Sequence, residues 1–289
     1  MTDKTKSVLF ALTTILLWSS AFPLTKVATA YIQPNALGFL RCSIAALILI
    51  VIGIINKIKL PRKPSHVLLF FLSGGLGFTL YMITFNTGML TLSSAMASLV
   101  IATTPVLTAI GASIIYKERI KPLGWACIAA AFFGVAILLL WGSQLSINSG
   151  CIWILCASSV FCGYNLMNRK LLSMGYNAVE CVTWSILCGA LLLLPFAPAA
   201  AAQVAEATWE ALLTVVYLGA MPSAAAYLFW SRAFSMAKKT SDVTNFQFLT
   251  PLVSTVLGFI ILGEIPGVST LVGGVIIISS IVLFGLKGR

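Results

Sequence analysis

Charged residues are scarce in this sequence: Asp, Glu, Lys and Arg make up only 9% of its 289 residues. A soluble domain carries roughly 25% charged residues, so this chain has too few to cover a surface that faces water. Hydrophobic residues make up 60% of the chain, and its mean hydropathy is +1.03. The composition excludes an ordinary soluble domain and predicts a protein embedded in a lipid bilayer.

Catalytic and metal-binding signatures are also missing. The single histidine, His66, follows Pro64 and Ser65, and the chain has no H-E-x-x-H, no G-x-S-x-G and no pair of mid-span aspartates. The seven cysteines form no C-x-x-C pair and have no zinc-site spacing. We therefore predict no enzyme activity, no metal and no cofactor. A membrane-embedded enzyme and a channel are disfavoured alternatives, because no filter sequence is visible either.

Long apolar runs divide the chain into predicted spans. Residues 44–55 and 276–286 are nearly unbroken apolar runs, which favours helices over the alternating strands of a barrel. The longest loop is predicted between Pro198 and Thr208. The fold class is an all-α integral membrane protein with ten transmembrane helices. The ten spans are 7–31, 35–56, 66–88, 93–116, 123–141, 150–168, 178–197, 209–232, 242–262 and 267–286.

The basic residues occur in short clusters between these spans. If the N-terminus is cytoplasmic, 16 of the 18 Lys and Arg residues fall in the cytoplasmic segments of a ten-span topology, while Glu206, Glu210 and Glu264 lie on or near the outer side. Such a one-sided distribution is typical of cytoplasmic loops, so we predict that both termini are cytoplasmic. It also assigns the net charge of +11 to loops rather than to a nucleic-acid-binding face, and we predict no nucleic-acid partner.

Parts of the chain repeat at an offset of 146 residues. Thr104-Pro105 and Thr250-Pro251 are each followed, thirteen residues after the proline, by a glutamate, which is Glu118 in the first case and Glu264 in the second. Glu118 stands in a basic segment and Glu264 does not, so the two equivalent positions belong on opposite sides of the membrane. The sequence therefore predicts two inverted five-helix repeats. In this architecture secondary transporters bind substrate near the midplane.

Two short motifs accompany the repeated Thr-Pro…Glu segments: Trp18-Ser19-Ser20-Ala21-Phe22 in the first span and Phe39-Leu40-Arg41 at the start of the second. In order and spacing, the whole chain resembles the ten-helix EamA-type branch of the drug/metabolite transporter superfamily. The resemblance implies one EamA-type repeat in residues 1–146 and a second, inverted one in 147–289. It also implies a central cavity surrounded by spans 1–4 and 6–9, with spans 5 and 10 at the periphery.

The resemblance further implies a secondary transporter of a bacterial cytoplasmic (inner) membrane that works by alternating access. Because the family consists mostly of exporters, we expect export of a small polar or zwitterionic metabolite, such as an amino acid or derivative. Import, and multidrug or cation export, stay open as alternatives, although no mid-span carboxylate is present for proton exchange. The expected partners are the lipid bilayer and a small-molecule substrate. A monomer or a homodimer is expected, since Ala126, Ala130 and Gly134 fit a dimer face or packing within one chain.

Polar and aromatic residues on the cavity-lining spans are the candidate substrate-binding residues, because such sites combine an apolar wall with a few polar groups. They are Trp18, Ser19, Phe22, Tyr81, Asn86, Ser158, Tyr164, Asn165, Tyr227, Trp230, Gln247 and Thr250. Proline disturbs a helix one turn back. Pro105, Pro222 and Pro251 are therefore candidate bending points, with static kinks as the alternative.

Two cations fall within predicted spans, Lys26 and Arg41. Each is a candidate contact for a carboxylate or phosphate of the substrate. The alternative is that each snorkels outward along its apolar stem. Glu118 and Glu264 lie at predicted helix ends, and we interpret them as capping or loop-anchoring residues rather than substrate ligands.

Overall fold

The structure, a computed structural model, describes residues 3–117, 119–140, 148–237 and 241–288. Every regular element within them is a helix, which confirms the predicted all-α class. The elements are α1 (Asp3–Thr29), α2 (Pro34–Ile55), α3 (Pro64–Gly74), η1 (Gly75–Leu80), α4 (Tyr81–Gly88), α5 (Ser94–Ile101), α6 (Thr104–Ile115), α7 (Pro122–Leu140), α8 (Ser149–Ser173), α9 (Ala178–Leu192), η2 (Leu194–Phe196), α10 (Ala197–Glu206), α11 (Trp209–Leu218), η3 (Gly219–Ala225), α12 (Ala226–Met236), α13 (Ser241–Thr244), η4 (Asn245–Leu249), α14 (Thr250–Leu262) and α15 (Val268–Lys287).

Most of these helices are membrane spans by length and composition. Among the described residues, seven helices are long and apolar enough to cross a bilayer, and α9 with the bent continuation Leu194–Glu206 makes an eighth. Two shorter apolar helices, Pro122–Leu138 and Phe246–Leu262, lie where the fifth and ninth spans are predicted. A total of ten crossings stays a prediction.

The same two spans are interrupted in each half of the chain. The third span consists of α3, η1 and α4, and its counterpart in the second half consists of α11, η3 and α12. Both η1 and η3 are π-helices. Pro222 lies inside η3, where its missing N–H breaks the α-helical ladder. In η1, Gly77 lies against the ring of Tyr164, so a Cβ there would overlap the ring.

The fourth span of each half is interrupted at its Thr-Pro pair. In the first half, α5 ends at Ile101 and α6 begins at Thr104, so Pro105 lies in the first turn of α6. In the second half, Pro251 lies in the first turn of α14, directly after the 3₁₀-helix η4. Proline is tolerated in a first turn because its missing N–H would have no intrahelical partner there. All three candidate bending prolines therefore lie at irregular points of the helices.

The segment that follows α9 corrects one prediction. The sequence predicts a loop from Pro198 to Thr208, whereas the structure has helix α10 over Ala197–Glu206, joined to α9 at a bend of 51°. Four alanines in a row, 199–202, favour a helix strongly, and Pro198 stands in its first turn, where it does no harm. The predicted loop is therefore wrong for most of its length.

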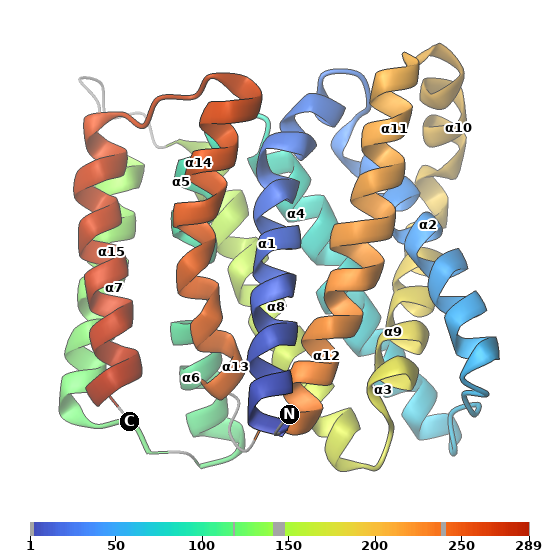
Figure 1. Cartoon of the computed structure of the whole chain (residues 1–289), viewed down its shortest axis with the longest axis horizontal. Helices are drawn as coiled ribbons and strands as arrows, with labels where there is room; N and C mark the ends of the chain where they lie inside the picture. Colours follow the sequence, from blue (N-terminus) through green and yellow to red (C-terminus); the bar gives the residue numbers. More distant parts are fainter. Residues whose placement is uncertain (1–2, 118, 141–147, 238–240, 289) are drawn as a thin grey trace.

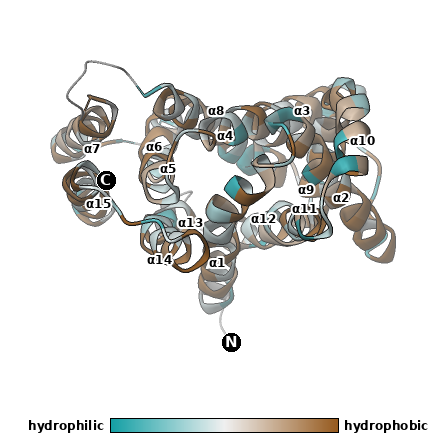
Figure 2. Ribbon diagram, turned by 90° about the horizontal axis from the view of Figure 1, so that it is seen from above, coloured by the Kyte–Doolittle hydropathy of each residue, from teal (hydrophilic) through white to brown (hydrophobic). Residues whose placement is uncertain are grey.

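Helices α7 and α15 pack against each other at one edge of the bundle, as Figures 1 and 2 show. Gly134 of α7 faces Gly273 and Ile277 of α15. This small-residue position therefore serves packing within the chain. Ala126 is exposed and Ala130 is half-buried, so their part in a dimer face stays a prediction. The edge position agrees with the peripheral role expected of spans 5 and 10.

Both described ends of the chain lie at one end of the bundle, which we call the termini-bearing end (Figure 1). The connections from α2 to α3, from α6 to α7 and from α8 to α9 lie at this end too. They carry most of the basic loop residues, including Lys57–Lys63 and Arg119–Lys121. The connection from α14 to α15, which contains Glu264, lies at the opposite end.

Candidate functional site

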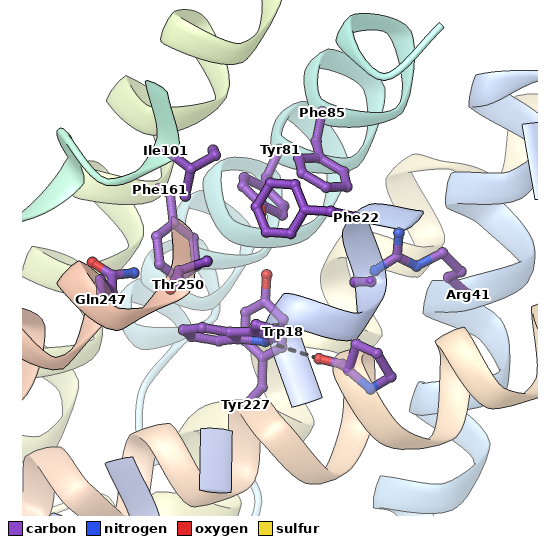
Figure 3. A pocket seen from close by; sticks show the side chains of 12 residues that line it. Trp18, Phe22, Arg41, Tyr81, Phe85, Ile101, Phe161, Tyr227, Gln247 and Thr250 are labelled. Carbon is purple, nitrogen blue, oxygen red and sulfur yellow. Dashed lines mark hydrogen bonds between the residues drawn. The ribbon is translucent and has the colours of Figure 1, made fainter. Parts of the chain in front are cut away.

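A small cavity is enclosed by helices from both halves of the chain. Its volume is about 20 Å³, room for about one water molecule. Aromatic side chains and a few polar ones line it from α1, α2, α4, α8, α12, η4 and α14 (Figure 3). A metabolite would need the surrounding helices to part. The lining residues are Trp18, Ala21, Phe22, Arg41, Tyr81, Phe85, Ile101, Phe161, Pro222, Tyr227, Gln247 and Thr250.

Aromatic rings form most of the cavity wall and pack against one another across the two halves. The Trp18 ring lies 5.4 Å from that of Phe161 and 5.3 Å from that of Tyr227, centroid to centroid. Tyr81 lies 5.1 Å from Phe161 and stacks on Phe85 at 5.4 Å. These separations are the favourable range for aromatic pairs. The wall is therefore apolar and flat-sided, suited to an apolar or aromatic portion of a ligand.

Two of these rings also bond to the π-helices. The Trp18 indole N–H donates to the Pro222 carbonyl in η3 at 3.0 Å (Figure 3), and the Tyr227 hydroxyl donates to the Gly77 carbonyl in η1 at 3.0 Å. In each case the ring belongs to one half and the π-helix to the other. π-Helical turns leave carbonyls without ordinary partners and are frequent at functional sites. The two bonds connect the halves of the chain across the cavity.

Arg41 is the one cation among the cavity-lining residues, and it is only 2% exposed. Its Nε donates to Ser223 Oγ at 3.3 Å, and Nη1 donates to Thr25 Oγ1 at 3.2 Å and to Asn86 Oδ1 at 3.3 Å. No acidic residue forms a salt bridge with it within the described part of the chain. The outward-snorkelling interpretation of Arg41 is therefore wrong: its polar neighbours hold the guanidinium inside the protein.

Gln247 supplies a second polar group, and in Figure 3 it lies across the cavity from Arg41. The side chain is 2% exposed, and its Oε1 atom has no hydrogen-bond partner among the described residues. A buried polar atom normally has a partner. Gln247 belongs to the 3₁₀-helix η4, which ends directly before Thr250-Pro251 and separates α13 from α14.

Lys26 has different surroundings from Arg41. Its Nζ donates to Glu264 Oε1 at 2.5 Å, and the other oxygen of this carboxylate accepts the backbone N–H of Ser94 at 2.8 Å. Ser94 is the first residue of α5. Glu264 thus caps α5 and joins it to α1, which confirms the interpretation of Glu264 as a capping residue. Glu118 lies outside the described residues.

The local fold explains how Glu264 reaches this position. Gly263 ends α14 in the left-handed region, with φ 66°, and the Glu264 N–H donates to the Gly258 carbonyl. This turn is a common helix stop that glycine favours. Lys117, which is equivalent at the 146-residue offset, also has a positive φ, 56°. Gly258 leaves room for the contact, because a Cβ there would lie 3.0 Å from Glu264 Oε2.

The structure brings half of the predicted substrate-binding residues to the cavity. Of the others, Ser19 donates to the Thr250 carbonyl, Asn86 supports Arg41, and Ser158 donates to the Val100 carbonyl of α5. Tyr164, Asn165 and Trp230 lie behind the wall, where Trp230 donates to Asn165 Oδ1. The six predicted substrate-binding residues that do line the cavity are Trp18, Phe22, Tyr81, Tyr227, Gln247 and Thr250.

Sequence reasoning missed four lining residues, Ala21, Phe85, Ile101 and Phe161. Phe85 had a usable signal, because it stands one helical turn after Tyr81 and shares its face. Phe161 stands between Ser158 and Tyr164 and looks like any core residue in an apolar span. Within the described residues, no group of three His, Cys, Asp or Glu side chains could hold a metal ion.

Comparison with known proteins bears on this geometry. The sequence matches the EamA-like transporter family twice, over residues 5–140 and 148–286. The chain belongs to this family. The two matches are consistent with an inverted repeat and confirm the resemblance drawn from the Thr-Pro…Glu segments. Family members similar to this chain are named transporters, not enzymes, so the chain is a membrane transporter.

Several relatives align along nearly the whole length. The chain is 28% identical to the uncharacterized transporter YdfC of Bacillus subtilis, covering 94% of this chain and 88% of the relative. It is 29% identical to a "probable terminal-alkyne amino-acid exporter" of Streptantibioticus cattleyicolor, covering 98% and 94%. A "probable amino-acid metabolite efflux pump" of Escherichia coli is 26% identical, covering 98% and 97%. A solved crystal structure at 20% identity has the same fold, with a TM-score of 0.66 and coverage of 98% and 97%.

Proposed function

We propose that this EamA-family transporter exports a small polar or zwitterionic metabolite, an amino acid or a derivative, by alternating access. The supporting observation is the closed cavity at the centre of the helices, with Arg41 and Gln247 set in an aromatic wall. Two relatives named for amino-acid or amino-acid-metabolite export support the substrate class and the outward direction.

The mechanism follows from the two halves that enclose the cavity. The π-helices η1 and η3 and the breaks before Pro105 and Pro251 are points where the spans bend, so that either end of the cavity opens in turn. Substrate-binding roles are assigned to the predicted residues that line the cavity, and supporting roles to those behind it. At the end opposite the termini, the ion pair between Lys26 and Glu264 joins α1 to the start of α5.

The proposed topology completes this mechanism. The bent α9–α10 pair and the two shorter apolar helices count as crossings, giving ten in two inverted five-helix repeats, residues 1–146 and 147–289. The termini-bearing end is cytoplasmic, because its loops carry the basic residues, and the membrane is the bacterial inner membrane. The protein acts as a monomer or a homodimer in the lipid bilayer.

Reconstitution tests the proposal. Liposomes containing the purified protein are loaded with a bacterial metabolite extract, and mass spectrometry identifies the compounds that leave faster than from protein-free liposomes. A released amino acid or derivative supports the proposal. Retention of every compound contradicts it. If a compound moves only inward in vesicles whose protein has the same orientation as in the cell, the importer alternative is favoured.

A matched pair of variants links flux to the cavity. Ala21→Phe fills the lining position on α1, whereas Ala126→Phe adds the same volume to the exposed face of α7. We expect Ala21→Phe to lower efflux at least about tenfold, since the cavity holds only about one water molecule. Ala126→Phe is expected to keep the wild-type rate, and equal loss in both variants contradicts a central site.

A further inference from the structure

The charge of Arg41 has no counter-charge among the described residues, although the guanidinium is almost fully buried. Its three recorded partners, Thr25, Ser223 and Asn86, are neutral oxygen acceptors at 3.2–3.3 Å, long for bonds from a charged donor. Its Nη2 atom donates no hydrogen bond within the described part of the chain. A buried charge is normally paired, because neutral groups replace the lost water poorly. The Arg41 guanidinium can therefore bind an anionic group of a ligand that enters the cavity.

The cavity determines which anion can reach it. The Arg41 side chain extends from α2 to the cavity (Figure 3). Only one cation lines the cavity, so its charge balances one negative charge. The guanidinium fork binds a planar carboxylate through two parallel bonds. A phosphate dianion would keep an unbalanced charge in an apolar wall.

The rest of the wall has no acidic side chain to receive a cation. Its lining is aromatic or aliphatic apart from Arg41, Gln247 and Thr250. A substrate ammonium would therefore meet ring faces and neutral oxygens but no opposite charge, and the like charge of Arg41 would repel it. Gln247, across the cavity, can donate to or accept from a neutral polar group.

We infer that the substrate is a small organic monocarboxylate with an apolar or aromatic body, and that its carboxylate pairs with Arg41. This inference rests on the proposed transport function and deepens it. The carboxylate is required, whereas a free amino group is not. The site binds an N-acyl amino acid, which is an anion, at least as well as the zwitterionic amino acid. It rejects an amino-acid ester, which has lost the carboxylate and is a cation. Arg41 is the residue that determines this specificity.

The test uses four related probes and one anion of different geometry. They are N-acetylphenylalanine (anion), phenylalanine (zwitterion), N-acetylphenylalaninamide (neutral), phenylalanine methyl ester (cation) and phenyl phosphate. Binding to purified protein is measured as thermal stabilisation over a concentration series, because a ligand of the folded state raises its unfolding temperature. For wild type we expect N-acetylphenylalanine to bind at least about tenfold tighter than its amide. This difference in affinity corresponds to the free energy of one charge-assisted hydrogen bond.

Three variants separate a charge contact from a folding effect. Arg41→Gln removes the charge, and we expect the acid-to-amide ratio to fall to about one, since the two probes differ only at the group that contacts Arg41. Arg41→Lys keeps the charge but loses the fork, so the ratio is expected to be intermediate; this variant serves where Arg41→Gln does not fold. Lys26→Gln is the matched control: it removes a cation that already pairs with Glu264, and its ratio is expected to equal that of wild type.

The outcomes are decisive. Equal binding of acid and amide by wild type, tighter binding of the ester or of phenyl phosphate, or no stabilisation by any probe overturns the inference. So does an unchanged ratio in both Arg41 variants. The proposed function fails separately, when the reconstituted protein releases no metabolite at all. Release of a compound without a carboxylate keeps the transport function and overturns the inference alone.

Discussion

Lys26 and Arg41 both interrupt apolar spans near the same end of the bundle, yet their surroundings differ. Lys26 is 30% exposed and pairs with the carboxylate of Glu264, which also caps α5. Arg41 is buried among hydroxyl and amide oxygens and faces the cavity. A cation with its own carboxylate joins helices, whereas a buried cation without one attracts an anion from outside. Burial and the identity of the partner, rather than charge in a span, distinguish the two.

The sharpest way to break this contrast is to give Arg41 a permanent partner. Thr25 Oγ1 lies 3.2 Å from Arg41 Nη1, so Thr25→Asp places a carboxylate beside the guanidinium. We expect affinity for a carboxylate substrate to fall about 100-fold, because the new ion pair competes with the ligand. The measurement is the concentration series of thermal stabilisation, with the isosteric Thr25→Asn as control. Equal affinities in the two variants would show that Arg41 does not bind the substrate.

The converse change removes the partner of Lys26. Glu264→Gln keeps an acceptor for the Ser94 N–H but loses the ion pair, and we expect the unfolding free energy to fall by about 1 kcal/mol, as suits a part-exposed pair. Lys26→Met should cost a similar amount, and the double variant less than the sum of both. The measurement is thermal unfolding in detergent. Additive losses would mean that the two side chains do not interact.

A smaller effect is expected where the aromatic wall meets the π-helices. Tyr227→Phe removes only the hydroxyl that donates to the Gly77 carbonyl. We expect a loss of about 1 kcal/mol of stability and a transport rate lowered severalfold, with no change in the acid-to-amide ratio set by Arg41. Flux and binding assays on one preparation check this. A changed ratio would place the Tyr227 hydroxyl, rather than Arg41, at the carboxylate.

The smallest effect is expected at the edge of the bundle. A Cβ on Gly134 would lie 2.7 Å from Ile277 Cγ1, so Gly134→Ala crowds α7 against α15, while alanine improves the helix itself. A Cβ there would also lie 3.1 Å from the Gly273 carbonyl oxygen, so the crowding outweighs the gain in helix propensity, and we expect the unfolding free energy to fall by about 1 kcal/mol. Binding ratios should equal those of wild type, which makes this variant the control for general destabilisation. A large loss of transport would give the edge pair an active role.

Much of the molecule was predictable because hydrophobic length and charge are local properties. The apolar runs locate the spans, and the 146-residue offset pairs Thr104-Pro105 with Thr250-Pro251, where the structure breaks both helices. Aromatic residues such as Trp18 and Tyr227 were recognisable cavity candidates, because large polar-tipped rings are unusual in mid-span. Helix α10 was missed because an alanine-rich segment carries little hydrophobic signal.

Other features depend on which side chains meet. Ser158 and Gln247 look equally suitable in sequence, but Ser158 faces the α5 backbone and Gln247 faces the cavity. Phe161 lines the cavity because the face of α8 that carries it is directed toward the cavity. No sequence pattern pairs Lys26 with Glu264, because the two residues are 238 positions apart.

Composition and span length were enough to predict a helical membrane protein, because the bilayer constrains each span separately. The two related halves came from the 146-residue offset, and the transporter function came from the resemblance to the EamA family. None of these sequence properties predicts that Lys26 is paired with a carboxylate and Arg41 is not. Both are single cations in apolar runs, and only the packing of α1, α2, α4 and η3 around Arg41, and of Glu264 against α1, decides which charge is already paired. Electrostatic partners come from positions far apart in the chain, so they are determined by the folded structure.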